Sequence, residues 1–337
     1  MKSTCIVGAG IAGLICLLLL KEAGADVSHV YIVDPYFDGG DLARKWTSIL
    51  SNTPWSKTVN ALLKACPSLT VTSSTEPSSL TPLVEIAHLL REKCATLLQQ
   101  ARSIQGVVTS AKYSSEGKEW TISIQSGGAE KTIRSRQLIL APGGEPKTLN
   151  LAIPSIPLEI ALDTYRLKSY IKSGDKVLVF GTMHSGTLVI RNLASLGGVV
   201  TAYYTKPEPF YWDRNNSYDG IKAEAADIAD KIVSGAIPVT LVQTKNTADV
   251  IRTSREAQWV VYAMGFTGRR ITLMVDGVEI DSSEYNGSTG ALVKAPAWGF
   301  GIAYPNLAPD GIHWDVGVAP FLEHIHQQIP MIISEVE

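Results

Sequence analysis

The chain has 337 residues and a formal net charge of −2, with 45% hydrophobic and 18% charged side chains. This composition is typical of a globular protein of about two domains, and it excludes intrinsic disorder, collagen-like repeats and a long coiled coil. Because 30 basic residues are balanced by 32 acidic ones, no strong positive field is available to collect phosphates. We therefore expect no nucleic-acid partner.

Cysteine spacing and the apolar N-terminus bear on the compartment. The four cysteines are scattered, and none lies in a Cys-x-x-Cys pair, as a zinc ribbon or a secreted disulfide scaffold would require. The apolar run from Cys5 to Leu20 is shorter than the roughly 20 residues that cross a bilayer, and glycines interrupt it. We therefore expect a cytoplasmic protein with no targeting segment and no membrane association.

The first part of the chain predicts a βαβ unit followed by a small antiparallel sheet. Strand, glycine turn, helix and strand succeed one another within about 30 residues, which is the pattern of a parallel βαβ unit. Residues 35–80 are polar and irregular. The expected elements are strands at 4–7 and 29–33, helices at 11–23 and 83–103, a β-meander at 107–113, 119–125 and 131–135, and an apolar strand at 137–141.

A second cycle of the same pattern begins near residue 155. Its expected elements are strands at 176–180, 199–205, 237–243 and 258–262 and helices at 187–196 and 219–234, with a last helix of the chain at 318–328. The order predicts an α/β fold of two Rossmann-like dinucleotide-binding domains, one inserted into the other. The predicted domains are 1–155, 156–264 and a C-terminal return to the first domain at 265–337.

The strongest motif is the glycine fingerprint G-x-G-x-x-G at residues 8–13. Gly8 permits a tight turn, Gly10 lets a pyrophosphate approach the backbone, and Gly13 allows close packing of helix on strand. The following helix start, with Ile11 and Ala12, offers free N–H groups to an anion. Asp34 ends the next strand about 20 residues further on, where a carboxylate binds a ribose diol. The sequence therefore predicts a dinucleotide site here.

The fingerprint alone fits NAD(P) as well as FAD, because both carry an ADP half. Two later segments favour FAD. The first is the loop that follows the second strand, which would wrap the ribityl chain and ring of a flavin. The second is the apolar strand with its glycine turn near residue 140, where flavoproteins with two dinucleotide domains close the FAD domain. The residues concerned are Gly40, Arg44, Trp46, Asn52 and Thr53 in the loop, and Ala141, Pro142 and Gly143 in the turn.

A second fingerprint at residues 181–186 is imperfect. Gly181 and Gly186 occupy the first and third glycine positions, but Met183 replaces the second and would crowd a pyrophosphate. No carboxylate stands where the spacing puts the ribose ligand, at Pro207, and Lys206 precedes it, so NADPH is favoured over NADH.

The sequence argues against a serine nucleophile and against a metal site built on histidines. Ser185 follows a strand as a nucleophile would, but the pattern G-x-S-x-G fails at Met183 and Thr187. His324 and His326 lie two residues apart and do not share a helix face, so we expect no metal site.

The order of four motifs resembles that of the thioredoxin-reductase-like flavoproteins of the pyridine nucleotide-disulfide oxidoreductase superfamily. The motifs are GAGIAG at 8–13, LILAPGG at 138–144, GTMHSG at 181–186 and VVYAMGF at 260–266. IPLEIALD at 156–163 and GFGIAYPN at 299–306 are similar to a subgroup whose second fingerprint reads Ser-His-Ser. The resemblance implies an FAD domain interrupted by an NAD(P)H domain, with hydride passing from the nicotinamide to the flavin.

Carried over position by position, the resemblance implies roles for individual residues. Val108 would lie beside the adenine of FAD, whose ADP half the first fingerprint and Asp34 would hold. The family's Gly-Asp at the ribityl chain has its nearest match at Asp315 and Val316, before a last helix that would point at the flavin. His313 is the candidate catalytic residue, from its position alone. Gly181, His184, Ser185 and Gly186 would line the NADPH pyrophosphate.

The chain departs from the family in lacking the redox Cys-x-x-Cys, so we expect no thioredoxin reductase activity. The prediction is an FAD-dependent oxidoreductase that takes hydride from NADPH and passes electrons to an unidentified small substrate, partner protein or oxygen. A flavin-dependent monooxygenase, a non-catalytic FAD/NAD(P)-binding module or sensor, and an NAD(P) dehydrogenase with one cofactor remain as alternatives. A homodimer is left open.

Overall fold

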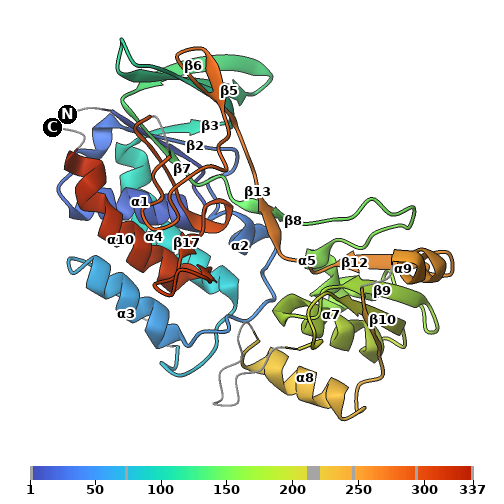
Figure 1. Cartoon of the computed structure of the whole chain (residues 1–337). Coiled ribbons are helices and arrows are strands. Elements are labelled where there is room, and N and C mark those ends of the chain that lie inside the picture. The colour runs from blue at the N-terminus through green and yellow to red at the C-terminus, as the bar shows by residue number, and fades with distance from the viewer. Residues whose placement is uncertain (1–2, 73–74, 211–220, 245–246, 293–294, 335–337) are drawn as a thin grey trace. The chain divides into compact units, whose positions relative to one another are not determined.

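The computed structural model describes residues 3–72, 75–210, 221–244, 247–292 and 295–334. The chain divides into two compact units (Figure 1). The first unit joins Met1–Glu145 to Thr267–Glu337, and the second is Pro146–Phe266. The first boundary therefore lies ten residues before the expected one at 155, because residues 146–155 pack with the second unit. Leu151 and Ile153 contact its core, and Ser155 pairs with Val260.

A five-stranded parallel sheet forms the centre of the first unit, in the order β16-β7-β1-β2-β3. Alternate residues of β1 face two different cores: Ile6 packs with the helices, whereas Cys5 and Val7 pack with a second sheet. The strands are β1 Thr4–Val7, β2 Val30–Asp34, β3 Arg102–Gln105, β7 Gln137–Leu140 and β16 Ala297–Gly299.

The helices and the second sheet cover opposite faces of this sheet, which gives three layers (Figure 1). The second sheet has the order β15-β14-β4-β5-β6 and contains the expected β-meander. Its strands are β4 Val107–Ser114, β5 Glu119–Ser126, β6 Ala129–Ser135, β14 Thr272–Val275 and β15 Val278–Ile280. The helices are α1 Ile11–Glu22, α2 Asp41–Arg44, α3 Trp55–Ala65, α4 Leu83–Gln100 and α10 Val318–Ser334, with short helical turns at Val27–His29 and Gly301–Ala303.

The second unit is built on a four-stranded parallel sheet in the order β11-β10-β9-β12. Its strands are β9 Lys176–Phe180, β10 Val199–Tyr204, β11 Thr240–Gln243 and β12 Trp259–Tyr262. Its helices are α5 Leu158–Ala161, α6 Thr164–Leu167, α7 His184–Ser195, α8 Glu224–Val233 and α9 Thr247–Ser254. The two α/β units confirm the predicted fold class.

Two short strand pairs complete the fold. The chain leaves the first unit along β8 (Gly144–Pro146) and returns along β13 (Phe266–Gly268), and these strands pair with each other. Near the C-terminus, β17 (Asn306–Leu307) pairs with β18 (Trp314–Asp315).

Most expected elements are present, but residues 35–80 contain two helices that the sequence did not indicate. In α3, Thr58, Leu62 and Ala65 are buried at helical spacing. A polar, Pro-rich neighbourhood on both sides hides this short periodicity. The expected helix at 219–234 is seen as α8, and its first residues, 219–220, lie outside the described part of the chain.

The described residues contain neither a candidate membrane span nor a candidate metal cluster. No helix among them combines the length and the apolar character that a membrane crossing requires. Nor do three or more His, Cys, Asp or Glu side chains gather there as a metal ion would need.

Candidate functional site

The first glycine fingerprint forms the turn between β1 and α1. Gly8 has φ +98°, and a Cβ added to it would lie 2.2 Å from the carbonyl oxygen of Ala141, at the end of β7. A Cβ on Gly13 would lie 1.9 Å from the oxygen of Gly8. Neither position can hold a larger residue without moving backbone, so the two glycines set how closely strand, helix and neighbouring strand approach.

Gly10 is the residue before α1 and differs from the other two glycines. A Cβ there would meet nothing closer than the Cα of Gly40, at 3.8 Å, so space is open beside it. Gly40 lies against it in turn, because a Cβ on Gly40 would come within 2.8 Å of the Cα of Gly10. Gly39 pairs with Gly10 as an isolated bridge. The turn at residues 39–40 thus rests on the start of α1, whose first N–H groups have no helical partners.

Asp34, at the end of β2, is buried and organises the neighbouring turns. Its Oδ2 accepts a 2.8 Å hydrogen bond from the N–H of Ala9, and its Oδ1 accepts 2.8 Å bonds from the N–H groups of Tyr36 and Phe37. A carboxylate offers about four acceptor positions. The three bonds leave one acceptor position on Asp34, which is compatible with one further hydroxyl donor in addition to its structural role.

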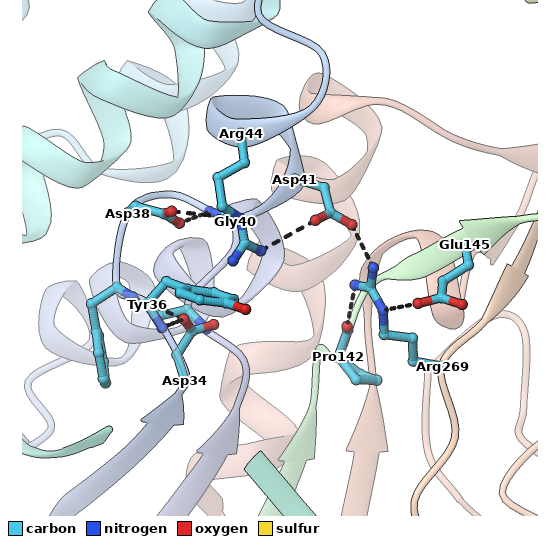
Figure 2. A network of polar contacts seen from close by, with 11 residues as sticks. Asp34, Tyr36, Asp38, Gly40, Asp41, Arg44, Pro142, Glu145 and Arg269 are labelled. Carbon is cyan, nitrogen blue, oxygen red and sulfur yellow. Dashed lines mark hydrogen bonds and ion pairs between the residues drawn. The ribbon is translucent and has the colours of Figure 1, made fainter. Parts of the chain in front are cut away.

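A network of ion pairs lies beside this turn (Figure 2). Arg44 is 3.2 Å from Asp41 and 3.5 Å from Asp38, and its guanidinium stacks 4.0 Å above the ring of Tyr36. Asp41 also binds Arg269, at 2.7 Å. Arg44 was expected to face a flavin, but its charge is already shared between two carboxylates. Tyr36 and Arg269 were not singled out from the sequence, because no local motif marks either one.

The remaining residues expected at FAD are scattered over several environments. Trp46 is buried, and Val108 is packed in the core between the two sheets of the first unit. Asn52 is exposed, and Thr53 is held in its turn by a 3.1 Å bond from its N–H to the Ser51 hydroxyl. Ala141, Pro142 and Gly143 follow β7; Ala141 and Pro142 border the glycine turn, whereas a Cβ on Gly143 would lie 2.9 Å from Nη1 of Arg269.

The turn after β16 also reaches the fingerprint, and sequence reasoning missed it. Gly301 has φ +81°, and a Cβ on it would lie 2.8 Å from the Cβ of Ala12. The available signal was Gly299-Phe300-Gly301 at the end of an apolar strand, which had been noted only for its family resemblance and not as part of a cofactor site. The Gly-Asp match had instead been sought at Asp315, which lies in β18 and accepts a 3.3 Å bond from Asn306, and at Val316, which is exposed.

His313 lies in the loop between β17 and β18, where it is exposed. Its Nδ1 is 2.6 Å from Oδ2 of Asp310. Hydrogen bonds from the backbone and side chain of His313 lower the pKa of Asp310 to about 2. His313 thus has Asp310, from its own loop, as one of its partners.

The second fingerprint repeats the first turn in the second unit. Gly181 has φ +103°, and a Cβ on it would lie 2.2 Å from the oxygen of Ala263. A Cβ on Gly186 would lie 2.1 Å from the oxygen of Gly181. Met183 precedes α7 with φ −78° and ψ −162°, against φ −75° and ψ −169° for Gly10. The backbone is the same, and only the side chain at this position differs.

Backbone hydrogen bonds show which residues correspond at the strand ends of the two units. The N–H of Gly8 donates to Val33 at 2.8 Å, and the N–H of Gly181 donates to Tyr203 at 2.9 Å. Tyr204 therefore stands at the position of Asp34, three residues before the Pro207 that the spacing indicated. The spacing misleads because a helical turn, Val27–His29, lengthens the connection before β2. Lys206 follows two residues later, and its carbonyl accepts a 2.8 Å bond from Gln243.

His184 and Ser185 occupy the first turn of α7. Burial lowers the pKa of His184 below its usual value; Lys222 acts in the same direction, whereas Glu224 opposes it. The imidazole is therefore neutral near pH 7. Its Nδ1 is buried, and within the described residues nothing hydrogen-bonds it.

Comparison with known proteins finds one matching family profile and several similar proteins. A family profile described as pyridine nucleotide-disulphide oxidoreductase matches residues 2–286. Monooxygenase AgnR1 from Paecilomyces divaricatus is 24% identical, over 96% of both chains. Bacillithiol disulfide reductase from Staphylococcus aureus has a similar fold, with TM-score 0.66 and 15% identity, over 100% of this chain and 99% of that one. OTEMO in complex with FAD and NADP has TM-score 0.62 and 14% identity, over 99% and 85%.

Proposed function

Because the chain belongs to the pyridine nucleotide-disulphide oxidoreductase family, a family of FAD-dependent oxidoreductases, we propose that it binds FAD and NADPH and passes electrons from NADPH to an external acceptor. The observation that carries this proposal is the duplicated glycine turn, with matching backbone hydrogen bonds at Gly8 and Gly181. A protein with a single dinucleotide would have no use for the second turn. FAD, when bound, supplies an acceptor for the hydride of a reduced nicotinamide.

The residues of the first turn fit FAD. Gly10 leaves open space beside the start of α1, where N–H groups and the helix dipole favour a pyrophosphate. Asp34 keeps one acceptor position for a ribose hydroxyl. The turns at Gly40 and Gly301 border the same helix start. These contacts bind and orient the cofactor, and the buried strands beneath them exclude water.

The second turn supports NADPH rather than NADH. At the end of β10, Tyr204 stands where the first unit has a carboxylate, so no acid is present there to repel a 2′-phosphate. Lys206 follows as a cation. The neutral imidazole of His184, in the first turn of α7, can donate one hydrogen bond. It adds no positive charge to that of Lys206.

The burial of the cysteines favours an electron acceptor outside the chain. All four are buried and unpaired. Burial raises the pKa of Cys66 and of Cys94 to about 12, so neither thiol ionises near neutral pH, and only the thiolate is reactive. Electrons would therefore pass directly from the cofactor to a small substrate, a partner protein or oxygen.

The test is the visible absorption spectrum of the purified or FAD-reconstituted protein before and after anaerobic NADPH. We expect flavin bands that bleach with NADPH, and more slowly with NADH. A protein that takes up no FAD contradicts the first half of the proposal. Bands that persist under NADPH contradict the second half and favour a binding module or sensor.

A flavin-dependent monooxygenase is the second candidate, because the relative named as a monooxygenase spans 96% of both chains. In that case we expect oxygen uptake by the NADPH-reduced protein to precede the release of peroxide by a measurable lag. Simultaneous uptake and peroxide release contradicts the monooxygenase and indicates a simple oxidase or reductase.

A further inference from the structure

Arg269 follows β13, on which the chain returns to the first unit, and it joins three separate segments. Its Nη2 donates to Oδ2 of Asp41 at 2.7 Å, and its Nη1 donates to the carbonyl of Pro142 at 3.1 Å. Its Nε donates to Oε1 of Glu145 at 3.2 Å (Figure 2). The guanidinium thus connects the start of α2, the turn after β7 and the departing strand β8. Planar donors in a fixed fork suit this arrangement, which a lysine could not reproduce.

Asp41 is the shared acceptor of this network. Its second oxygen, Oδ1, binds Arg44 at 3.2 Å, and only 14% of its side chain is exposed. By contrast, 62% of the Glu145 side chain is exposed, so that contact is screened by water. The bonds of Arg269 to Asp41 and to the Pro142 carbonyl therefore contribute most to holding these segments together.

Helix α2 depends on its neighbours for its position. It has four residues, none of them fully buried, and so short a helix is not stable by itself. Leu42 and Ala43 pack partly against the core, and the bond from Arg269 to Asp41 adds a polar anchor at the first residue of the helix. The residue before it is Gly40, which touches Gly10 of the fingerprint. A continuous chain of contacts thus runs from Arg269 through Asp41 to the turn that borders the proposed FAD pyrophosphate.

We propose that Arg269 is a positioning residue for FAD: it holds the turn at residues 39–41 against the glycine fingerprint. The inference rests on the FAD site of the proposed function. Without Arg269 the turn would have to be ordered as FAD binds, and that ordering lowers affinity without removing any contact to the cofactor. The anchoring residue belongs to the returning strand, so FAD affinity depends on a segment more than two hundred residues away from the turn.

The experiment titrates FAD into apoprotein and follows the change in flavin fluorescence, with no nucleotide present. The variants are Arg269→Gln, Asp41→Asn and their combination. We expect each single variant to raise the Kd for FAD about tenfold. The loss in the double variant should be clearly smaller than the sum of the two single losses, because all three variants lose the bond between Arg269 and Asp41. Arg269→Lys should recover only part of the loss.

The matched control is Arg134→Gln, which breaks an exposed 3.2 Å pair with Glu119 in the same unit and should change the Kd less than twofold. The unfolding midpoint of each apoprotein shows whether the variants merely destabilise the fold. Wild-type affinity in Arg269→Gln, or losses that add in the double variant, overturns the inference. So does a fall of the apoprotein midpoint that accounts for the whole effect. If the wild-type apoprotein itself takes up no FAD, the proposed function fails instead.

Discussion

The two glycine turns of this protein share nearly the same backbone conformation but differ in several side chains, of which two bear on the choice of dinucleotide. Gly8 and Gly181 make the same hydrogen bond to the neighbouring strand, and the residues before the two helices have nearly the same φ and ψ. In the second turn, however, Met183 replaces Gly10 and Tyr204 replaces Asp34. The first and third glycines therefore set the geometry of the turn, whereas the proposed difference in dinucleotide rests on the middle position and the strand end.

The largest effect is expected where backbone meets backbone. Gly8→Ala places a Cβ 2.2 Å from the oxygen of Ala141 at a positive φ, so we expect a loss of about 3 kcal/mol or more in the free energy of unfolding, with loss of FAD. Urea unfolding measures it. The control is Gly127→Ala, which also has a positive φ but nothing within 4 Å, and should cost about 1 kcal/mol. Equal losses would contradict the steric argument.

The corresponding change in the second turn should weaken the reaction with NADPH and leave FAD binding unchanged. Gly181→Ala places a Cβ 2.2 Å from the oxygen of Ala263 and distorts only the second unit's turn. We expect the variant to retain its flavin absorption, while the rate of anaerobic reduction by NADPH falls at least about tenfold. A variant that loses FAD but keeps NADPH-driven reduction of added flavin would reverse the assignment of the two sites.

A smaller effect, of opposite sign, is expected at the middle position. Met183 has an ordinary negative φ, so Met183→Gly removes a side chain without relieving strain, and glycine is tolerated before a helix. We expect about a threefold lower Kd for NADPH in anaerobic titrations, because the pyrophosphate can approach the backbone. Met183→Leu, of similar volume, is the control. Unchanged affinity in the glycine variant would show that the methionine does not crowd the nucleotide.

The smallest expected effect is on pH dependence. Burial lowers the pKa of His184, so the unfolded chain binds a proton more readily than the folded one. The free energy of unfolding should therefore decrease as pH falls through about 6.5, the unfolded value, toward the folded pKa. In His184→Gln this loss should be reduced, although buried His324 shifts in the same direction and will preserve part of it. Unfolding midpoints between about pH 5 and 8 test this, with exposed His326→Gln as the control.

The glycine turns were predictable because their constraints are local. A strand, a glycine at positive φ and a helix start lie within ten residues, and steric exclusion acts on neighbours in the chain. The spacing rule for the ribose ligand was less successful, since it counts residues and cannot see the helical turn at Val27–His29. It selected Pro207 where the hydrogen bonds select Tyr204.

The sequence by itself determined the two α/β units and their glycine turns, because these depend on periodicity and on contacts between near neighbours. It also shows directly that the chain has no Cys-x-x-Cys. Only the tertiary structure decided which distant segments border the first turn. Arg269 reaches Asp41 across 228 residues and Pro142 across 127. Gly301 reaches Ala12 only because β16 joins the sheet beside β7. The physical reason is that hydrogen bonds and packing act over ångströms in space, whatever the separation along the chain.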